Sequence, residues 1–204
     1  MYTFSQGSLL HKLRIFTIRV NLKISFYFFS NPEIQERIFE EITENIGEDE
    51  GINHESISKL EYLEASLMET MRMCPPATGH LRACTRDCVV KGIKFQKGMS
   101  VAMWSYASHY YPKFYPDPEV FKPERFLKEN SDQVIPFTWR PFGSGQRVCI
   151  GQRYAMVGMK LFMAKFIAKF KLLPTEKTKL EYPTPNGFLL ISYKESVAKI
   201  EKRQ

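Results

Sequence analysis

The chain has 204 residues, of which 44% are hydrophobic, 14% aromatic and 25% charged, so it can form a packed core and is not of the disordered class. Its 29 Lys and Arg residues outnumber 22 Asp and Glu residues, which gives a formal net charge of +7, and the basic residues are scattered along the chain. We therefore expect no nucleic-acid partner, and an acidic protein or an anionic membrane surface stays open.

The four cysteines, Cys74, Cys84, Cys88 and Cys149, are too few for a disulfide framework in a chain of this length. Cys84 and Cys88 are four residues apart, but no matching Cys or His pair follows them, so we expect no zinc site. The sequence predicts free thiols in a reducing compartment at Cys74, Cys84 and Cys88.

The first thirty residues are apolar but are interrupted by charged side chains. Their longest uninterrupted apolar run, residues 24–30, is much shorter than the ~20 residues that a membrane-spanning helix needs. The segment also lacks the small-residue cleavage site of a signal peptide. We expect it to pack as a helix or strand rather than to anchor the chain in a membrane.

Two helices are predicted in the first half of the chain. Ser30 or Asn31 and then Pro32 mark the start of the first helix, isoleucines four residues apart line one face, and Gly47 marks its end. The second helix is expected over residues 57–73, where a proline pair terminates it.

The second half is predicted to contain short strands, a long irregular segment and one long helix. Strands are expected over residues 88–103 with turns at Gly92 and Gly98, and a short helix follows at residues 105–111. Residues 112–141 contain six prolines and read as an irregular segment long enough to have a function. A helix that is buried on most faces is expected over residues 149–170, and a last strand over residues 186–193.

Cys149 lies in the stretch RPFGSGQRVCIGQRYAM, residues 140–156, where the long helix is expected to begin. Backbone N–H groups and the helix dipole at such a position favour a thiolate. Gly143 and Gly145 allow a bulky flat group to lie against the backbone, and Gly151 removes a side chain one turn away. These features suit an axial haem thiolate, and they equally suit a structural cysteine in a glycine-rich loop.

The spacing of six residues favours the haem ligand. They form the pattern F-G-x-G-x-R-x-C-x-G and are Phe142, Gly143, Gly145, Arg147, Cys149 and Gly151. This pattern resembles the haem-ligand signature of the cytochrome P-450 family of haem-thiolate monooxygenases, and the wording PFGSGQRVCIG and FKPERF leans toward animal microsomal members. The resemblance implies a fold that is mainly α with a small β-sheet.

The same resemblance implies a division of the chain. Residues 31–204 would be the C-terminal, haem-binding part of a cytochrome P-450 domain, truncated relative to full-length members. Residues 1–30 stay unassigned, as either the end of the helix over the haem or unrelated sequence.

Glu69 and Arg72 are three residues apart on the second predicted helix, so they share a face and can pair. Read alone, the pair fits a surface ion pair of little energetic value, but the methionines around it indicate burial. In the family, the arginine of a P-E-R-F segment joins the glutamate of a helical E-x-x-R, which implies Arg125 here. The implied role of the three is structural, fixing the loop that carries Cys149.

Two further arginines, Arg82 and Arg147, resemble the family's haem-propionate partners by position, and a solvated side chain stays open as the alternative for Arg82. The segment that crosses the haem edge and touches substrate is implied at Ala77, Thr78, Gly79, His80 and Leu81. Residues 186–189 resemble a hairpin tip at the pocket, with Phe188 as a substrate contact.

The function implied by the resemblance is insertion of one oxygen atom of dioxygen into an apolar organic substrate. Cys149 would be the proximal thiolate ligand of haem b, iron protoporphyrin IX. Electrons would come from an NADPH-dependent reductase, so NADPH acts only indirectly, and the reductase's acidic surface would meet Arg147, Arg153 and Lys160. Full-length relatives are expected at the endoplasmic reticulum membrane, on its cytosolic face.

Two other interpretations stay open. Residues 1–30 lack the acid–alcohol pattern of the family's oxygen-activating helix. An alternative is a non-catalytic, truncated fragment that keeps the proximal haem-binding motif, and a third is a basic interaction domain without haem. We expect this chain alone to show no substrate oxidation.

Overall fold

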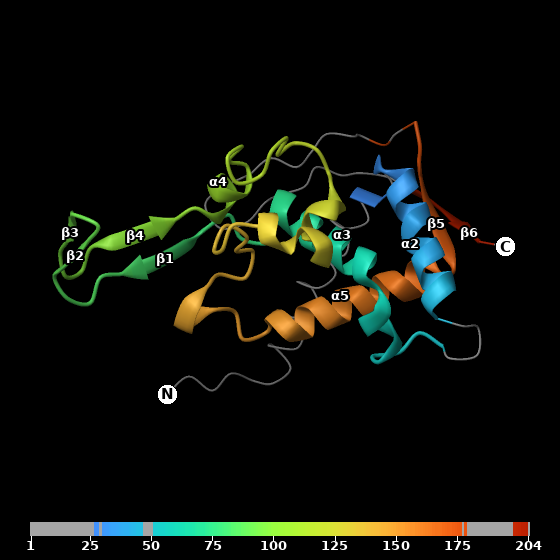
Figure 1. The fold of residues 1–204 in the computed structure, drawn as a ribbon, viewed down its shortest axis with the longest axis horizontal. Coiled ribbons are helices and arrows are strands. Elements are labelled where there is room, and N and C mark those ends of the chain that lie inside the picture. The colour runs from blue at the N-terminus through green and yellow to red at the C-terminus, as the bar shows by residue number, and fades with distance from the viewer. Residues whose placement is uncertain (1–26, 29, 47–50, 177, 179–197, 204) are drawn as a thin grey trace.

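The computed structural model describes residues 27–28, 30–46, 51–176, 178 and 198–203. Most of the unassigned first segment, the predicted strand at residues 186–193 and Phe188 lie outside these residues. Three helices form a packed body, and a ribbon of strands projects from it as an arm (Figure 1). The expectation of a mainly α fold with a little β-structure is confirmed.

Helix α2 (Pro32–Asn45) buries the isoleucine stripe that the sequence predicts. Ile34, Ile38 and Ile42 are 7%, 0% and 4% exposed. Asn31 is the N-cap residue and Pro32 the first helical residue, as predicted, but the Asn31 side chain makes no capping bond, because its Nδ2 donates to the carbonyl of Tyr27 at 2.7 Å.

Helix α3 (Glu61–Met73) begins later than predicted. Residues Ser56–Lys59 form a separate 3-10 turn, η1, and buried Leu60 leaves helical geometry before α3 starts. The free N–H groups of Tyr62 and Leu63 in the first turn donate to the Glu41 carboxylate of α2, at 2.6 and 2.9 Å. A side chain from another helix thus caps α3, which sequence-local patterns cannot show.

Helix α5 (Gln152–Ile167) starts three residues after Cys149 rather than at it. The prediction of burial on most faces is wrong, because the side chains of Tyr154 and Phe162 are 74% and 47% exposed. The buried face that packs into the core consists of Met159, Lys160, Met163, Ala164 and Ile167.

The burial of Lys160 corrects another expectation. Its side chain is only 7% exposed, and its Nζ donates to Glu64 of α3 at 2.6 Å. An ammonium that is enclosed and already paired cannot contribute to a basic docking surface, whereas Arg147 and Arg153 are exposed.

The described strands form three separate two-stranded antiparallel sheets rather than one small sheet. Their pairs are β1 (His80–Ala83) with β4 (Ser100–Met103), β2 (Cys88–Val90) with β3 (Ile93–Phe95), and β5 (Phe170–Pro174) with β6 (Ala198–Lys202). The predicted strands in residues 88–103 are confirmed, with positive φ at the turn glycines Gly92 and Gly98. β1, β5 and β6 were not predicted.

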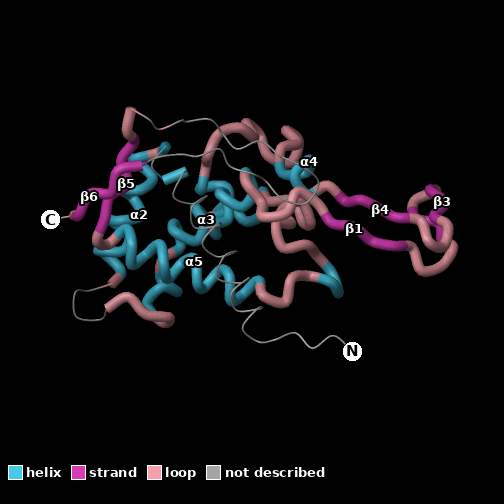
Figure 2. The backbone as a smooth tube through the Cα atoms, turned by 180° about the vertical axis from the view of Figure 1, so that it is seen from behind, coloured by secondary structure: helices cyan, strands magenta, loops and turns pink. Residues whose placement is uncertain are grey.

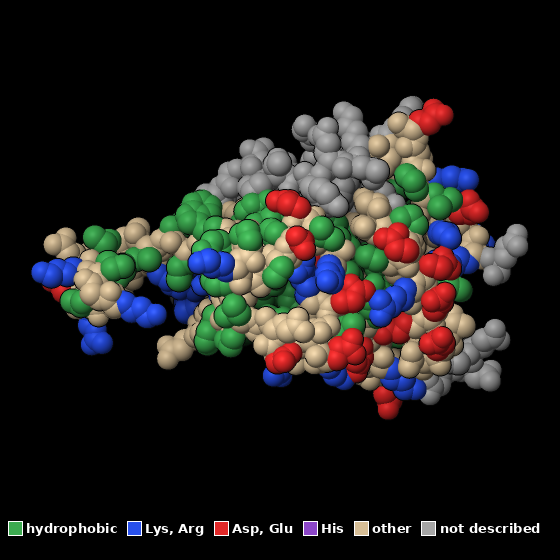
Figure 3. Space-filling view, turned by 45° about the horizontal axis from the view of Figure 1, so that its top comes forward, with side chains coloured by type: hydrophobic (Ala, Val, Ile, Leu, Met, Phe, Trp, Pro, Cys, Tyr) green, Lys and Arg blue, Asp and Glu red, His purple; other side chains and the backbone are tan. Residues whose placement is uncertain are grey.

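The first two sheets build the arm, residues 80–103, which extends away from the helices in both views (Figures 1 and 2). On the face drawn in Figure 3, hydrophobic and basic side chains alternate over the arm, and acidic and basic side chains interleave over the body. The third sheet is tied to α2 by Gln35, whose amide donates to the Leu172 carbonyl at 3.0 Å and accepts from its N–H at 2.7 Å.

Residues 112–141 are largely irregular, as predicted. They contain only two 3-10 turns, η2 (Pro123–Phe126) and η3 (Lys128–Gln133), and they follow the short helix α4 (Ser105–His109). We call residues 112–141 the long loop. Within the residues that the structure describes, no helix has both the length and the apolar character needed to cross a membrane.

Candidate functional site

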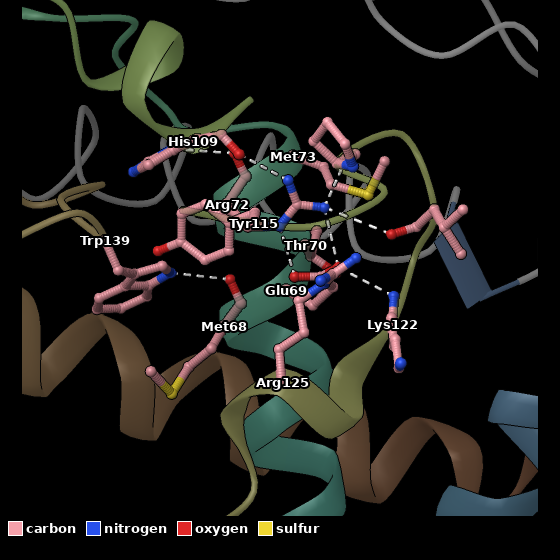
Figure 4. A network of polar contacts seen from close by, with 12 residues as sticks. Met68, Glu69, Thr70, Arg72, Met73, His109, Tyr115, Lys122, Arg125 and Trp139 are labelled. Atoms are coloured by element: carbon pink, nitrogen blue, oxygen red, sulfur yellow. Dashed lines mark hydrogen bonds and ion pairs between the residues drawn. The ribbon is translucent and has the colours of Figure 1, made fainter. Parts of the chain in front are cut away.

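The Glu69 and Arg72 side chains of α3 form a bidentate ion pair in the protein interior (Figure 4). Arg72 Nε donates to Glu69 Oε2 at 2.7 Å and Arg72 Nη2 donates to Oε1 at 2.9 Å. Both side chains are 0% exposed. A buried pair of this kind is stable only if further partners satisfy the remaining donors and acceptors.

Those partners come from outside α3. Arg72 Nη1 donates to the carbonyl of His109 at 2.8 Å and Nη2 to the carbonyl of Pro118 at 2.8 Å. The backbone N–H of Lys122 donates to Glu69 Oε1 at 2.9 Å. Burial alone lowers the pKa of Arg72, but its bonds to Glu69 outweigh burial and hold the pKa above its ordinary value. The pair thereby fixes the course of the long loop.

Arg125, on η2, joins the same carboxylate. Its Nε lies 3.4 Å from Glu69 Oε1, and its Nη2 donates to the carbonyl of Asp117 at 2.9 Å. The structure therefore brings together the three residues that the sequence places in one structural network.

His109 is a member of this network that sequence reasoning missed. Its Nε2 accepts from the backbone N–H of Arg140 at 3.0 Å, so the ring proton sits on Nδ1 and is donated to the Arg72 carbonyl at 3.0 Å. Burial, followed by the charges of Arg72 and Arg140, lowers the pKa of His109 to about 3. A neutral imidazole thus links α3 to the stretch that carries Cys149.

We call residues 140–151 the cysteine loop. Its start is held by His109 and by Trp139, whose Nε1 donates to the Met68 carbonyl at 3.1 Å (Figure 4). Its two ends are joined by the Cys149 N–H, which donates to the Phe142 carbonyl at 3.0 Å. Gly143 and Gly145 adopt φ of +80° and +73°, which side chains on an L-residue disfavour.

The surface around Cys149 fits a flat apolar group with a metal at its centre. Cys149 is exposed, and its neighbours Val148 and Ile150 are 44% and fully exposed, whereas Phe142 in the same loop is buried. A Cβ on Gly151 would lie 3.8 Å from the Cys149 sulfur, so glycine keeps that side of the sulfur clear. A cysteine thiolate is one of the axial ligands that proteins provide to haem iron.

The base of the arm brings positive charge to the cysteine loop. A Cβ on Gly143 would lie 3.1 Å from His80 Nε2, so β1 and the loop are in close contact. His80 and Arg82 alternate with exposed residues on β1 and share its inner face. The pKa of His80 is lowered, first by burial and then by the charges of Arg82 and Arg140. Of these two, Arg82 is the predicted propionate partner, and its guanidinium suits a carboxylate.

Residues 77–81 lead into β1 beside this contact. Thr78 is buried at 1% exposure, and its carbonyl accepts from the Tyr106 N–H of α4 at 2.9 Å. A Cβ on Gly79 would approach the Met103 carbonyl of β4 to 2.8 Å, so glycine permits the close approach there. Ala77 and His80 are half-buried, and Leu81 is 51% exposed. Arg147 is exposed on the 3-10 turn η4 (Gly145–Arg147) of the cysteine loop.

Comparisons with known proteins agree with this arrangement. A family model described as Cytochrome P450 matches residues 17–198. Cytochrome P450 3A7 of Homo sapiens is 35% identical over 180 residues, which are 88% of this chain and 36% of that protein. Cytochrome P450 3A16 of Mus musculus is 36% identical over 183 residues, 88% of this chain and 36% of that protein. Cytochrome P450 9e2 of Blattella germanica is 36% identical over 170 residues, 81% of this chain and 32% of that protein.

The chain thus spans about a third of the length of these curated relatives. The relatives confirm the predicted resemblance, including its lean toward animal members. Because the family model extends over most of the chain and relatives above 30% identity align with most of it, the chain belongs to the cytochrome P450 family.

Proposed function

We propose that the protein to which this chain belongs is a haem-thiolate monooxygenase, and that this chain forms the proximal side of its haem site. Cys149 is the proposed proximal ligand of haem b. The observation that carries the proposal is that Cys149 is exposed on a loop whose start is hydrogen-bonded, through His109, to the buried Glu69–Arg72 network.

The haem, when bound, supplies the iron at which dioxygen is activated. Cys149 would hold that iron through its sulfur, and buried Phe142 would anchor the start of the loop. Gly143, Gly145 and Gly151 place no side chain at three positions of the loop, and Gly151 keeps one side of the sulfur open. Arg82 and Arg147 would bind the carboxylates at the edge of the group through charge-assisted hydrogen bonds.

Glu69, Arg72 and Arg125 act through the backbone rather than on the reacting atoms. They hold the long loop and, through His109, the N–H of Arg140 at the start of the cysteine loop. A ligand that is held in place before the metal binds loses less conformational entropy on binding. Their role is therefore to position Cys149.

The proposed substrate is an apolar organic molecule. Ala77 and Leu81 are its proposed contacts because they reach the surface beside Arg82, together with His80 at the arm base. Thr78 and Gly79 act there by placing the backbone, and Phe188 remains a proposed contact from outside the described residues.

The proposed electron donor is an NADPH-dependent reductase with an acidic surface. Arg147 and Arg153 are exposed around Cys149 and α5 and suit this docking, and Lys160 is removed from the set. The proposed location is the cytosolic face of the endoplasmic reticulum membrane, which the similarity to the animal relatives supports.

The test is a carbon-monoxide difference spectrum of the reduced, haem-reconstituted chain. We expect a red-shifted Soret band, typical of thiolate-ligated haem, that disappears in Cys149→Ala. Cys88→Ala is the matched control, because it removes an exposed thiol on the arm and should keep the band.

Two results would contradict the proposal. A band that survives in Cys149→Ala would assign the iron ligand to another residue. A chain that shows native far-ultraviolet circular dichroism but no such band would favour the alternative of a fragment that keeps the motif without binding haem.

A further inference from the structure

Cys84 and Cys88 form a close pair of thiols on the arm, outside the proposed haem site. Their sulfur atoms lie 3.9 Å apart, about the distance of van der Waals contact. Cys84 directly follows β1, and Cys88 begins β2. Both are free thiols in this structure.

The backbone holds this pair in place. The Cys84 N–H donates to the Met99 carbonyl at 2.8 Å, and the Cys84 carbonyl accepts from the Gly98 N–H at 2.8 Å. On the side of Cys88, the carboxylate of Asp87 accepts from the Lys97 N–H at 2.7 Å. Bonds to the same turn therefore fix both ends of the segment 84–88, so the approach of the two sulfurs follows from the backbone course.

The pair is open to small molecules. Cys88 is exposed and Cys84 is half-buried. The arm that carries them projects from the body of the molecule (Figures 1 and 2). Cys74, by contrast, is 1% exposed in the core and is shielded from such reagents.

A metal ion is a poor match for the pair. Soft divalent metals such as zinc take four ligands in structural protein sites. Within the described residues, no group of three or more Cys, His, Asp or Glu side chains is placed to hold a metal ion. Two adjacent thiols without a third ligand suit oxidation to a disulfide better.

We propose that Cys84 and Cys88 are a redox-modification site that closes to an intramolecular disulfide when it meets a low-molecular-weight disulfide of the glutathione type. The Cys88 thiolate attacks one sulfur of the oxidant, forms a mixed disulfide and releases one thiol. The Cys84 thiolate then attacks the Cys88 sulfur and releases the second thiol. The two protein thiols lose two electrons, and the oxidant is reduced to two thiols.

The site favours a disulfide that opens again. The closed ring spans only residues 84–88, so the entropic stabilisation that comes from closing a long loop is small here. An exposed disulfide is also readily attacked by other thiols. Partial desolvation and the neighbouring Cys84 thiol raise the pKa of the Cys88 thiol, so a smaller fraction of it is thiolate and its attack on the oxidant is slower.

Closure would join the end of β1 to the start of β2. Arg82 lies two residues before Cys84 on the strand that contacts the cysteine loop. Disulfide formation would therefore take place next to Arg82, the proposed propionate partner. Neither the oxidation nor the experiment that tests it requires bound haem.

The experiment equilibrates the folded chain with mixtures of glutathione and its disulfide, then blocks remaining thiols by alkylation in acid and digests with trypsin. Trypsin cleaves after Arg82, Arg86 and Lys91, so closure leaves peptides 83–86 and 87–91 joined in one species. We expect the folded chain to form this joined species at a ratio of glutathione disulfide to glutathione about tenfold lower than the urea-unfolded chain requires. The reason is that folding raises the effective concentration of one thiol near the other. Addition of excess dithiol should return both cysteines to the alkylated form.

Three results would overturn the proposal. These are joined peptides at the same oxidant ratio in folded and unfolded chain, separate glutathione adducts on both cysteines, or a link that dithiol does not reverse. Cys84→Ser serves as the chemical control, because it should abolish the joined species and leave Cys88 as a glutathione adduct. The wild-type comparison stands whether or not this variant folds.

Discussion

Glu69 and Arg72 have no exposed side-chain surface, whereas Ile150, next to Cys149, is fully exposed. His109 and Trp139 help to join the two regions. The buried network satisfies its charges from within the chain. The cysteine loop instead presents apolar side chains and an exposed sulfur, a surface that is stabilised when another group covers it. The buried network positions Cys149, whereas the cysteine loop supplies the surface on which haem is proposed to bind. Substitutions in the network should lower the stability of the fold, and substitution of Cys149 should leave it nearly unchanged.

The largest effect is expected for Glu69→Ala. The substitution leaves the Arg72 guanidinium buried without its counter-charge, and it also removes the acceptor of the Lys122 N–H. Breaking one partner of a buried pair typically costs about 3–5 kcal/mol, so we expect a loss of this size in the free energy of unfolding. Urea unfolding followed by circular dichroism measures it.

Lys199→Ala is the matched control for an exposed ion pair. Lys199 and Glu201 are 62% and 55% exposed and lie 3.2 Å apart. Exposed pairs contribute about 0–1 kcal/mol, so the control should change stability little. Equal losses in the two variants would mean that the buried network has no special role.

The second prediction concerns acid. The pKa of His109 is about 3 in the folded chain, below the ~6.5 of an unfolded histidine. Above pH 6.5 the group is neutral in both states; as the pH falls below that value, the unfolded chain binds a proton that the folded chain does not. Stability should therefore fall toward acid, by about 2 kcal/mol between pH 7.5 and pH 5 from this group.

The control is His109→Gln, whose side-chain carbonyl can still accept the Arg140 N–H while nothing titrates. This variant should be less stable at pH 7.5, because the Arg72 carbonyl loses its donor. Its loss between pH 7.5 and pH 5 should be smaller than that of the wild type by about 2 kcal/mol. Identical pH dependence in the two proteins would show that His109 is not the titrating group.

The contrast also explains what the sequence could predict. The Glu69–Arg72 contact follows from helical spacing, and the isoleucine stripe of α2 follows from its period, because both are local properties of one helix. The cysteine pattern likewise lies within ten consecutive residues, from Phe142 to Gly151. The predicted resemblance to the family rests on such short-range signals.

Features that depend on distant segments were missed. His109 has no local pattern that distinguishes it, since its partners come from α3 and from Arg140. The sequence suggests a surface position for Lys160, and only the packing of α5 on α3 places it beside Glu64. β5 pairs with β6 across more than twenty intervening residues, and a strand partner at that separation gives no signal in either segment.

The third prediction tests the contact between the arm and the cysteine loop. Gly143 and Gly145 both have positive φ, so alanine at either position costs about 1–2 kcal/mol from backbone strain. A Cβ at Gly143 would additionally lie 3.1 Å from His80 Nε2, whereas a Cβ at Gly145 would have no neighbour within 4 Å. Gly143→Ala should therefore destabilise the chain more than Gly145→Ala.

Equal losses of stability in the two variants would mean that His80 of β1 makes no steric contact with position 143 of the loop. The same pair of variants can be read by haem titration as well. Gly143→Ala should weaken haem binding more, because displacement of His80 also displaces Arg82 on the same strand face.

The smallest effect on stability is expected for Cys149→Ser, although this residue is the proposed iron ligand. The side chain is exposed, and serine keeps the backbone N–H that donates to the Phe142 carbonyl. Exposed substitutions away from special features usually change the free energy of unfolding by less than about 0.5 kcal/mol. Urea unfolding in the absence of haem should therefore give the same midpoint for the variant and the wild type. A large loss would mean that Cys149 is a structural part of the loop. The buried network would then not be the only element that stabilises the loop, and the proposed division between a positioning network and a binding surface would be wrong at Cys149.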